Sequence, residues 1–244
     1  DADDIWSPTF LEELLEFLSK TGFDMVYADA EQFLSGKNKK IGNFLRFNPQ
    51  QGEVTREMGV AGKCIILPSG TLIKRSTFIA AGGFDPNVSR TEDSDLWMRL
   101  LFNGARIGYL RKILFRFRIS PGSGSGNLIE RIERDVIRWR TLQKKLAFTD
   151  EENRIVEAHI ARDKASVLRA KGRIYLEAGE WQLARQMFLE AKQKAAELKL
   201  PLVHRLKLRM VLFMLRVWPP ALRQMFRQFR GDEIDFMPKE KLQV

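Results

Sequence analysis

The fold is indicated most clearly by the segment Ala81-Gly82-Gly83-Phe84-Asp85. It is followed, five residues later, by Thr91-Glu92-Asp93-Ser94-Asp95-Leu96-Trp97-Met98-Arg99-Leu100. Two consecutive glycines permit a tight backbone turn beside a bound ligand. The residues from Asp93 to Asn103 have the apolar spacing of a helix that ends at Gly104. Acids in a first turn are favoured by the helix dipole alone, but a carboxylate here could also act as a general base.

A second acidic cluster, Asp1-Ala2-Asp3-Asp4, stands directly before a helix signal at Ser7-Pro8, with Gly22 as its C-cap. Carboxylate oxygens bind hard divalent cations, so the cluster could hold Mg²⁺ or Mn²⁺. A solvated acidic helix start explains the same residues, and for this cluster taken alone it is the better interpretation.

Taken together, the two motifs resemble family 2 glycosyltransferases. The segment Asp1–Pro8 resembles that family's metal-binding DxD segment, and Ala81–Asp85 with Glu92–Leu100 resembles its acceptor-side motif. The resemblance covers about residues 1–126. It implies a GT-A fold, of the α/β class, and transfer of a sugar from a nucleotide-diphospho-sugar to a hydroxyl acceptor with inversion.

The resemblance also assigns candidate site residues. It makes Asp93, with Glu92 beside it, the catalytic carboxylate that removes the acceptor proton. It places Asp3 and Asp1 at the metal. Donor-binding residues would be Asp1, Asp3, Gly83, Asp95, Arg116 and Arg118.

In that family the DxD segment lies midway through the catalytic domain, after a half that binds the nucleotide base. No such half precedes Asp1, and the chain does not begin with Met. We therefore expect residues 1–126 to be the C-terminal half of a transferase domain and residues 1–244 alone to be inactive, and the donor base stays unassigned.

Short apolar runs at Phe23 to Ala28, Arg106 to Leu110 and Ile113 to Ile119 predict strands between the helices, which is α/β layering. Glycines then alternate with serines from Gly122 to Gly126. No strand–helix–strand return follows, so a dinucleotide-binding motif is disfavoured. The resemblance makes this a loop over the diphosphate, and a flexible linker explains it equally well.

Residues 127–244 are helical in pattern and form a predicted helical extension. We expect helices at 128–147 and 150–168, followed by a tetratricopeptide-like hairpin at about 168–200. Such repeats bind proteins and need neighbouring helices to bury their faces. A non-catalytic scaffold that carries a truncated or degenerate transferase half is therefore the alternative function.

The distribution of charged residues separates the same two parts of the chain. Residues 1–126 carry 16 basic and 15 acidic side chains, a net charge of +1, whereas residues 127–244 carry 25 and 16, a net charge of +9. No acid lies between Glu197 and Asp232, and Pro219-Pro220 divides the segment 199–230 into two basic amphipathic helices. This pattern suits an anionic membrane surface, and packing into the helical core is the alternative.

The rest of the composition indicates which binding partners and which cellular compartment to expect. One cysteine excludes an internal disulfide and suits the cytoplasm. No apolar run reaches the ~18 residues of a membrane span, and no recognition motif supports nucleic-acid binding. We expect a cytoplasmic protein, peripheral on the inner face of the membrane, that uses a lipid-linked acceptor in cell-surface polysaccharide or glycolipid assembly.

Overall fold

The computed structural model describes residues 3–34, 40–45, 48, 51–119, 128–198 and 202–228. They fall into two compact units. The first combines the described residues up to 119 with residues 141–152, and the second combines 128–140 with 153–198 and 202–228. The corner at 141–152 thus belongs to the first unit, although the sequence analysis placed it in the helical extension.

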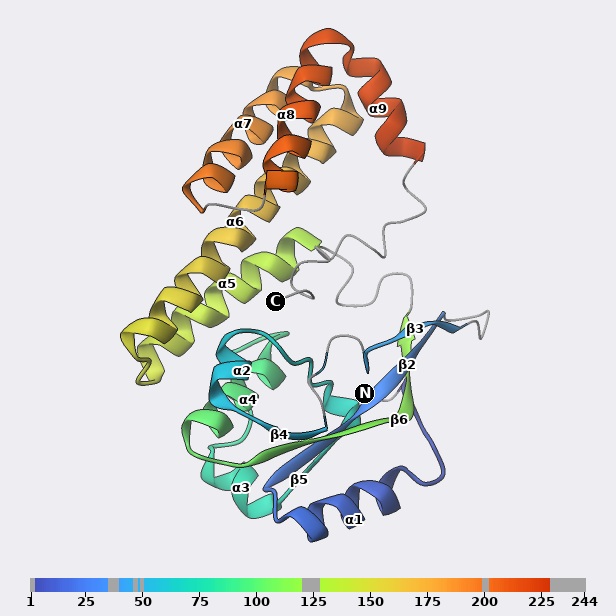
Figure 1. Ribbon diagram of the computed structural model, residues 1–244, viewed down its shortest axis with the longest axis vertical. Coiled ribbons are helices and arrows are strands. Elements are labelled where there is room, and N and C mark those ends of the chain that lie inside the picture. Colours follow the sequence, from blue (N-terminus) through green and yellow to red (C-terminus); the bar gives the residue numbers. More distant parts are fainter. Residues whose placement is uncertain are drawn as a thin grey trace. The chain divides into compact units, whose positions relative to one another are not determined.

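The first unit is built on a mixed sheet, in which the described residues form six strands (Figure 1). Its central pair is parallel, β2 (Met25–Leu34) with β6 (Ile107–Ile119). The strands β1 (Ile5–Trp6) and β4 (Gly52–Val54) pair with β6, while β3 (Lys40–Asn43) and β5 (Thr71–Ile73) pair with β2, all antiparallel.

Strand β6 is continuous, whereas the sequence predicted two separate strands. The register with β2 jumps from Leu110, opposite Ala28, to Ile113, opposite Asp29. Arg111 and Lys112 are extra residues in β6, and a second shift at Leu114 follows directly. From Phe115, β2 then pairs with β6 as far as Ile119. The sequence alone does not show this continuity, because the strand that pairs on both sides of Arg111 and Lys112 lies about 80 residues away in the chain.

Helix α1 (Phe10–Thr21) covers one face of the sheet. Phe10 and Leu14 are fully buried in a cluster with alternate residues of β2, because successive strand side chains point to opposite faces. Gly22 ends the helix at a φ of +68°, as predicted. The helix begins later than predicted, at Phe10, and the amide of Ser7 instead donates to the carbonyl oxygen of Leu114 in β6 (2.8 Å).

Besides β5, four helical elements lie between β4 and β6 in the chain. They are α2 (Arg56–Val60), the 3₁₀ turn η2 (Pro68–Gly70), α3 (Arg75–Ala80) and α4 (Glu92–Phe102). Helix α4 buries the apolar side chains that the sequence assigned to its inner face, Leu96, Trp97, Leu100 and Leu101, and Gly104 follows it at a φ of +78°. The helix predicted there is confirmed.

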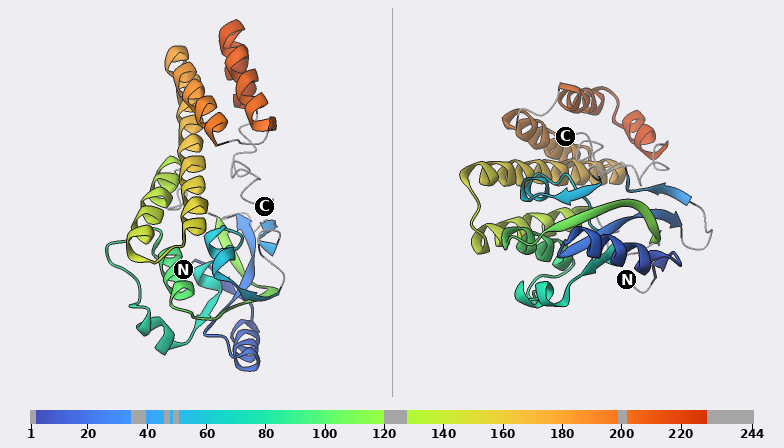
Figure 2. Two further views of the ribbon diagram at one scale, coloured as in Figure 1. Left: turned by 60° about the vertical axis from the view of Figure 1, so that its left-hand side comes forward. Right: turned by 60° about the horizontal axis from the view of Figure 1, so that its bottom comes forward.

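The helical part contains α5 (Leu128–Lys145), α6 (Asp150–Ala178), α7 (Trp181–Glu197), α8 (Leu202–Val217) and α9 (Pro219–Gln228). Figure 2 shows α6 as one long rod. The predicted helix end at 168 is therefore wrong: no proline or capping residue interrupts the pattern there, and α6 continues to Gly179, which has a φ of +88°. None of the described helices is long and apolar enough to cross a bilayer.

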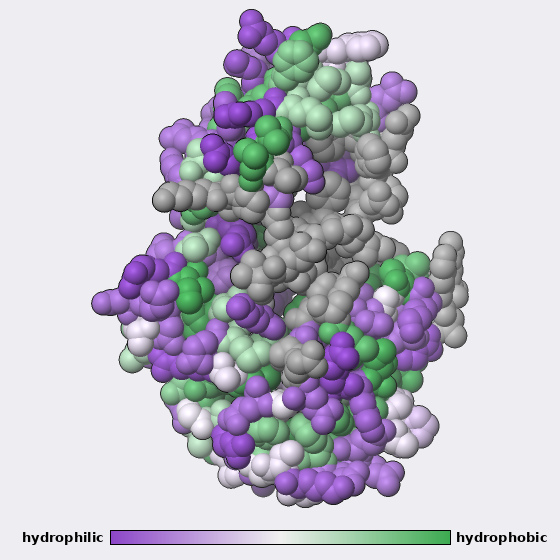
Figure 3. Space-filling view, viewed as in Figure 1, coloured by the Kyte–Doolittle hydropathy of each residue, from purple (hydrophilic) through white to green (hydrophobic). Residues whose placement is uncertain are grey.

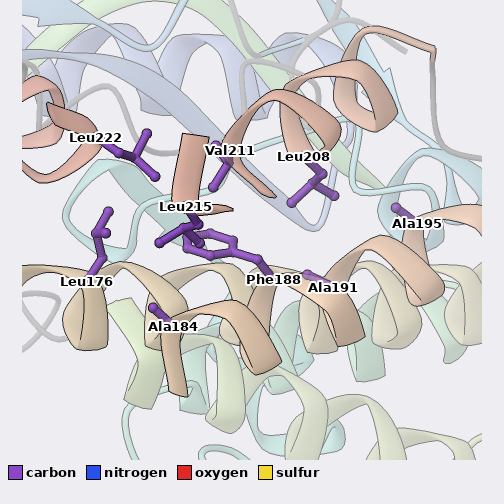
Figure 4. Close-up of a cluster of buried hydrophobic side chains, with 9 residues drawn as sticks. All are labelled: Leu176, Ala184, Phe188, Ala191, Ala195, Leu208, Val211, Leu215 and Leu222. Atoms are coloured by element: carbon purple, nitrogen blue, oxygen red, sulfur yellow. The ribbon is translucent and has the colours of Figure 1, made fainter. Parts of the chain in front are cut away.

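Four of these helices share an apolar core, drawn in Figure 4. Leu176 of α6, Phe188 of α7, Leu215 of α8 and Leu222 of α9 meet in it. Gly172 lets α6 approach α7, because a Cβ added there would lie 3.0 Å from the Phe188 ring. A helical hairpin is thus present at the expected place, and its assignment to the tetratricopeptide class stays a prediction.

Candidate functional site

The N-terminal acidic segment lies beside the end of β6. Asp4 accepts a hydrogen bond from the backbone amide of Arg118 through Oδ1 (2.9 Å), and Arg118 Nε donates to the backbone oxygen of Asp3 (2.9 Å). The register of β1 with β6 places Ile5 opposite Arg116. Of the predicted metal ligands, Asp3 therefore lies next to a predicted phosphate-binding arginine, and Asp1 lies outside the described residues.

The oxygen atoms of this segment fit a hard cation. The Asp3 side chain is exposed, and its contact with Arg118 uses only its backbone. Asp4 Oδ2 is buried and has no hydrogen-bond partner. Among the described residues no three Asp, Glu, His or Cys side chains form a group that could hold a metal. Mg²⁺ commonly needs only one or two carboxylates when substrate phosphates complete its coordination.

Arg116 and Arg118 share one face of β6, because they lie two residues apart in the strand. Both guanidinium groups lie over the ring of Phe33, at 4.3 and 4.6 Å from its centroid. Glu31 approaches Arg116 Nε at 3.4 Å and also pairs with Lys40 (2.7 Å). This arrangement orients two planar donor groups of the kind that bind phosphate oxygens.

The second acidic cluster forms the first turn of α4. Glu92 and Asp93 are half-buried, and Asp93 Oδ1 accepts the backbone N–H of Ser94 (2.6 Å). Glu92 Oε2 is buried without a hydrogen-bond partner. The cluster therefore combines the Asp93 carboxylate, held at a helix N-terminus, with the buried Glu92 Oε2, which is able to accept one more hydrogen bond.

Asp95 points away from the solvent and holds Arg99. It is fully buried, and its Oδ2 accepts from Arg99 Nε at 2.7 Å. Arg99 in turn donates to the carbonyl oxygens of Ala81 and Gly83, the latter at 2.8 Å. Gly83 has a φ of +64°, which favours glycine. Asp95 thus positions the glycine turn, and its contact with a donor stays a prediction.

Both acidic clusters are tied to the segment 65–69, the run between α2 and β5. Trp6, two residues after Asp4, donates from Nε1 to the carbonyl oxygen of Ser69 (2.8 Å). Trp97, two residues after Asp95, donates from Nε1 to the carbonyl oxygen of Ile66 (3.3 Å). The structure therefore brings the two motifs to one segment, although 90 residues separate them in the sequence.

Asp29, in the middle of β2, is a buried acid that the sequence analysis missed. Burial raises its pKa, although hydrogen bonds from the Tyr109 hydroxyl and from Asn48 Nδ2 (3.0 Å) act in the opposite direction. Asn48 Oδ1 also accepts the amide of Ile65 (2.8 Å), so Asp29 helps to hold the segment 65–69. The available signal was a carboxylate within the apolar run Met25-Val26-Tyr27-Ala28-Asp29-Ala30.

The corner between α5 and α6 also contacts this region of the first unit. Lys145 pairs with Asp85 of the glycine turn and, with Asn87, lowers the pKa of that carboxyl to about 2. Arg56 Nη2 lies 2.6 Å from Glu152 Oε2, and its guanidinium stacks on Phe102 at the end of α4. These contacts fix the glycine turn and the last turn of α4 to the corner.

No protein-family model matches the chain, and no curated protein matches it significantly. Among solved structures, the chain is similar to residues 1–349 of S. aureus TarS in complex with UDP-GlcNAc, with a TM-score of 0.51 and 16% identity over 93% of this chain and 66% of that chain. Other crystal structures of the same protein match with TM-scores of 0.49 for TarS 1–349, at 16% identity over 94% of this chain and 66% of that chain, and 0.48 for TarS, at 14% over 94% and 39%.

The chain thus spans slightly less than two thirds of the length of TarS 1–349. At 16% identity the likeness concerns the fold alone. The arrangement of the mixed sheet and its helices is that of a glycosyltransferase-like α/β fold.

Proposed function

We propose that this chain carries the acceptor side of an inverting, metal-dependent glycosyltransferase of family 2 with a GT-A fold. The observation that carries the proposal is the attachment of both acidic clusters to the segment 65–69 by Trp6 and Trp97. The fold likeness to TarS, crystallised with UDP-GlcNAc, supports a nucleotide-diphospho-sugar as donor.

Asp93 is the general base of the proposed reaction. Its carboxylate takes the proton of the acceptor hydroxyl, and the oxygen then attacks the anomeric carbon while the bond from that carbon to the diphosphate breaks. A single in-line displacement inverts the anomeric centre. Glu92, whose Oε2 is buried and has no hydrogen-bond partner, lies beside the base and accepts a hydrogen bond from the acceptor.

Donor binding falls to the residues around the end of β6 and the glycine turn. Arg116 and Arg118 bind the diphosphate, and Asp1, Asp3 and Gly83 complete the donor site. Asp95, which is buried, acts on this site through Arg99, which donates to the Gly83 carbonyl oxygen. Asp3 and Asp1 would hold Mg²⁺ or Mn²⁺, and a metal bound there would neutralise charge on the leaving diphosphate. The exposed Asp3 carboxylate and the unpartnered Asp4 Oδ2 beside it support this placement.

The acceptor in this proposal is a lipid-linked hydroxyl compound of cell-surface polysaccharide or glycolipid assembly, used in the cytoplasm. The tetratricopeptide-like hairpin of α6 and α7 would bind a protein partner. The assignment of this hairpin to the tetratricopeptide class is supported by the close approach of α6 and α7 at Gly172 and Phe188.

Turnover of nucleotide-sugars by the intact gene product, with and without the substitution Asp93→Asn, tests the proposal. Transfer that disappears with Asp93→Asn supports a transferase. An intact protein that binds no nucleotide-sugar and transfers none would instead favour the scaffold alternative, in which the transferase half is degenerate.

A further inference from the structure

Helix α8 has apolar side chains on two opposite faces. Leu208, Val211 and Leu215 are buried in the helical core. The opposite face exposes five large apolar side chains, which we call the α8 stripe, with exposed fractions of 64, 48, 51, 63 and 61% for Leu202, Leu206, Met210, Phe213 and Val217. At 3.6 residues per turn these five lie within an arc of roughly 80°. Figure 3 shows apolar residues at the surface over the region of α8 and α9.

The stripe continues into the turn that follows the helix. Trp218 is 64% exposed and is followed directly by α9. The alternative that the aromatic residues of this segment face inward is therefore wrong for Phe213 and Trp218. The side chains of Phe226 and Phe229 lie outside the described residues.

Basic residues border the stripe on both sides. At 100° per residue, Arg205, Arg209 and Arg216 follow one edge of the stripe and Lys207 lies beyond the other edge. Lys207, Arg209 and Arg216 are exposed. The sequence places no acid between Glu197 and Asp232, so nothing in this segment offsets their charge.

We propose that the α8 stripe is a docking surface for an anionic lipid bilayer, on which α8 lies in the plane of the membrane. The apolar side chains enter the boundary between headgroups and acyl chains, and the flanking bases reach the lipid phosphates. A partner protein would need an apolar groove with acidic residues along its edges. An anionic bilayer combines an apolar interior with negatively charged headgroups at every point of its surface. This docking does not depend on the proposed transferase activity.

Co-sedimentation of the full 244-residue chain with vesicles tests the proposal. We expect binding to phosphatidylcholine vesicles that contain phosphatidylglycerol at low salt, weaker binding at high salt, and little binding to phosphatidylcholine alone. Phe213→Glu with Val217→Glu should weaken the binding at least tenfold. The matched control is Ile137→Glu with Ile174→Glu, which alters two exposed isoleucines of α5 and α6 (64 and 55%) and should leave binding unchanged.

A second pair separates charge from apolar burial. Arg209→Gln with Arg216→Gln should weaken binding roughly fivefold per residue, because each base near an anionic surface contributes about 1 kcal/mol. Arg185→Gln with Lys192→Gln, at exposed positions of α7, is the control. These variants leave the apolar packing intact, so they decide the question even if the glutamates reduce helical content by circular dichroism.

Three results would overturn the proposal. One is failure of the folded chain to sediment with anionic vesicles at low salt. Another is equal binding by the stripe variants and their controls. The third is a dimer in size-exclusion chromatography that the stripe variants dissociate while vesicle binding is absent, which would make the stripe a contact between copies of the chain.

Discussion

Arg99 holds the backbone of Gly83: its Nη2 donates to the Gly83 carbonyl oxygen at 2.8 Å, while its Nε binds the fully buried Asp95 at 2.7 Å. The contact joins the two parts of the acceptor-side motif, the glycine turn and α4, through one guanidinium. The motif therefore has an internal structural reason for containing both an acid and a base four residues apart.

Removal of this guanidinium should destabilise the first unit strongly. In Arg99→Met the Asp95 carboxylate stays buried without its cation, and such a loss costs about 3–5 kcal/mol of unfolding free energy. Chemical denaturation measures it. Arg75→Met, at an exposed position of α3, is the control and should change stability by less than about 0.5 kcal/mol. Similar values for the two variants would show that Arg99 does not support the turn.

Lys145→Met should raise the pKa of Asp85, which is now held at about 2 by Lys145 and Asn87. A depressed folded pKa adds stability above the ordinary Asp pKa and loses it as the pH falls toward 2. The free energy of unfolding that is lost at acid pH when Asp85 is protonated should therefore be smaller in the variant. Carboxyl NMR titration measures the pKa directly, with Lys144→Met as the neighbouring control. An unchanged Asp85 titration would show that the pair does not form in solution.

Asp29 should make the protein less stable as the pH rises. Its folded pKa is raised above the unfolded value, so the folded state binds the proton more tightly. Stability from this group is full below the unfolded pKa and is lost as the pH rises through the folded pKa. Asp29→Asn keeps the shape and should flatten this pH dependence, as followed by denaturation between acidic and neutral pH. A parallel pH profile for parent and variant would contradict a raised pKa.

Asp3→Ala should reduce metal-dependent donor affinity without affecting the fold. The exposed side chain makes no contact that the fold needs, because the hydrogen bond to Arg118 uses the Asp3 backbone, so stability should change by less than about 0.5 kcal/mol. Calorimetry of nucleotide-sugar binding to the intact protein, with and without Mn²⁺, measures the affinity. Glu12→Ala, an exposed acid on α1, serves as control. The same Mn²⁺ dependence in Asp3→Ala and the parent would remove Asp3 from the metal site.

The elements with strong local signals could be predicted from the sequence. The apolar spacing of Leu96, Trp97, Leu100 and Leu101 defined α4, the positive φ of Gly22 needed a glycine, and Pro219 separated α8 from α9. In each case the determining interaction lies within a few residues of chain, so a single sequence contains it.

The rest depends on contacts between distant residues. The Asp29, Asn48 and Tyr109 network joins three parts of the chain, and no spacing in the sequence indicates it. The continuity of β6 comes from its partner β2, and the attachment of both acidic clusters to the segment 65–69 comes from two tryptophan N–H groups. The contact of Lys145 with Asp85 was missed because the corner at 141–152 reads as part of the helical extension.

The most direct test of the account is the turnover of Asp93→Asn in the intact gene product, measured together with donor binding. Asparagine keeps the shape of the side chain and the acceptor for Ser94 N–H, but it cannot take a proton. We predict a loss of ~10²–10⁴ in transfer rate with unchanged nucleotide-sugar affinity. Near-normal turnover by Asp93→Asn, with transfer lost in a folded Asp95→Asn variant, would contradict the assignment of Asp93 as the base.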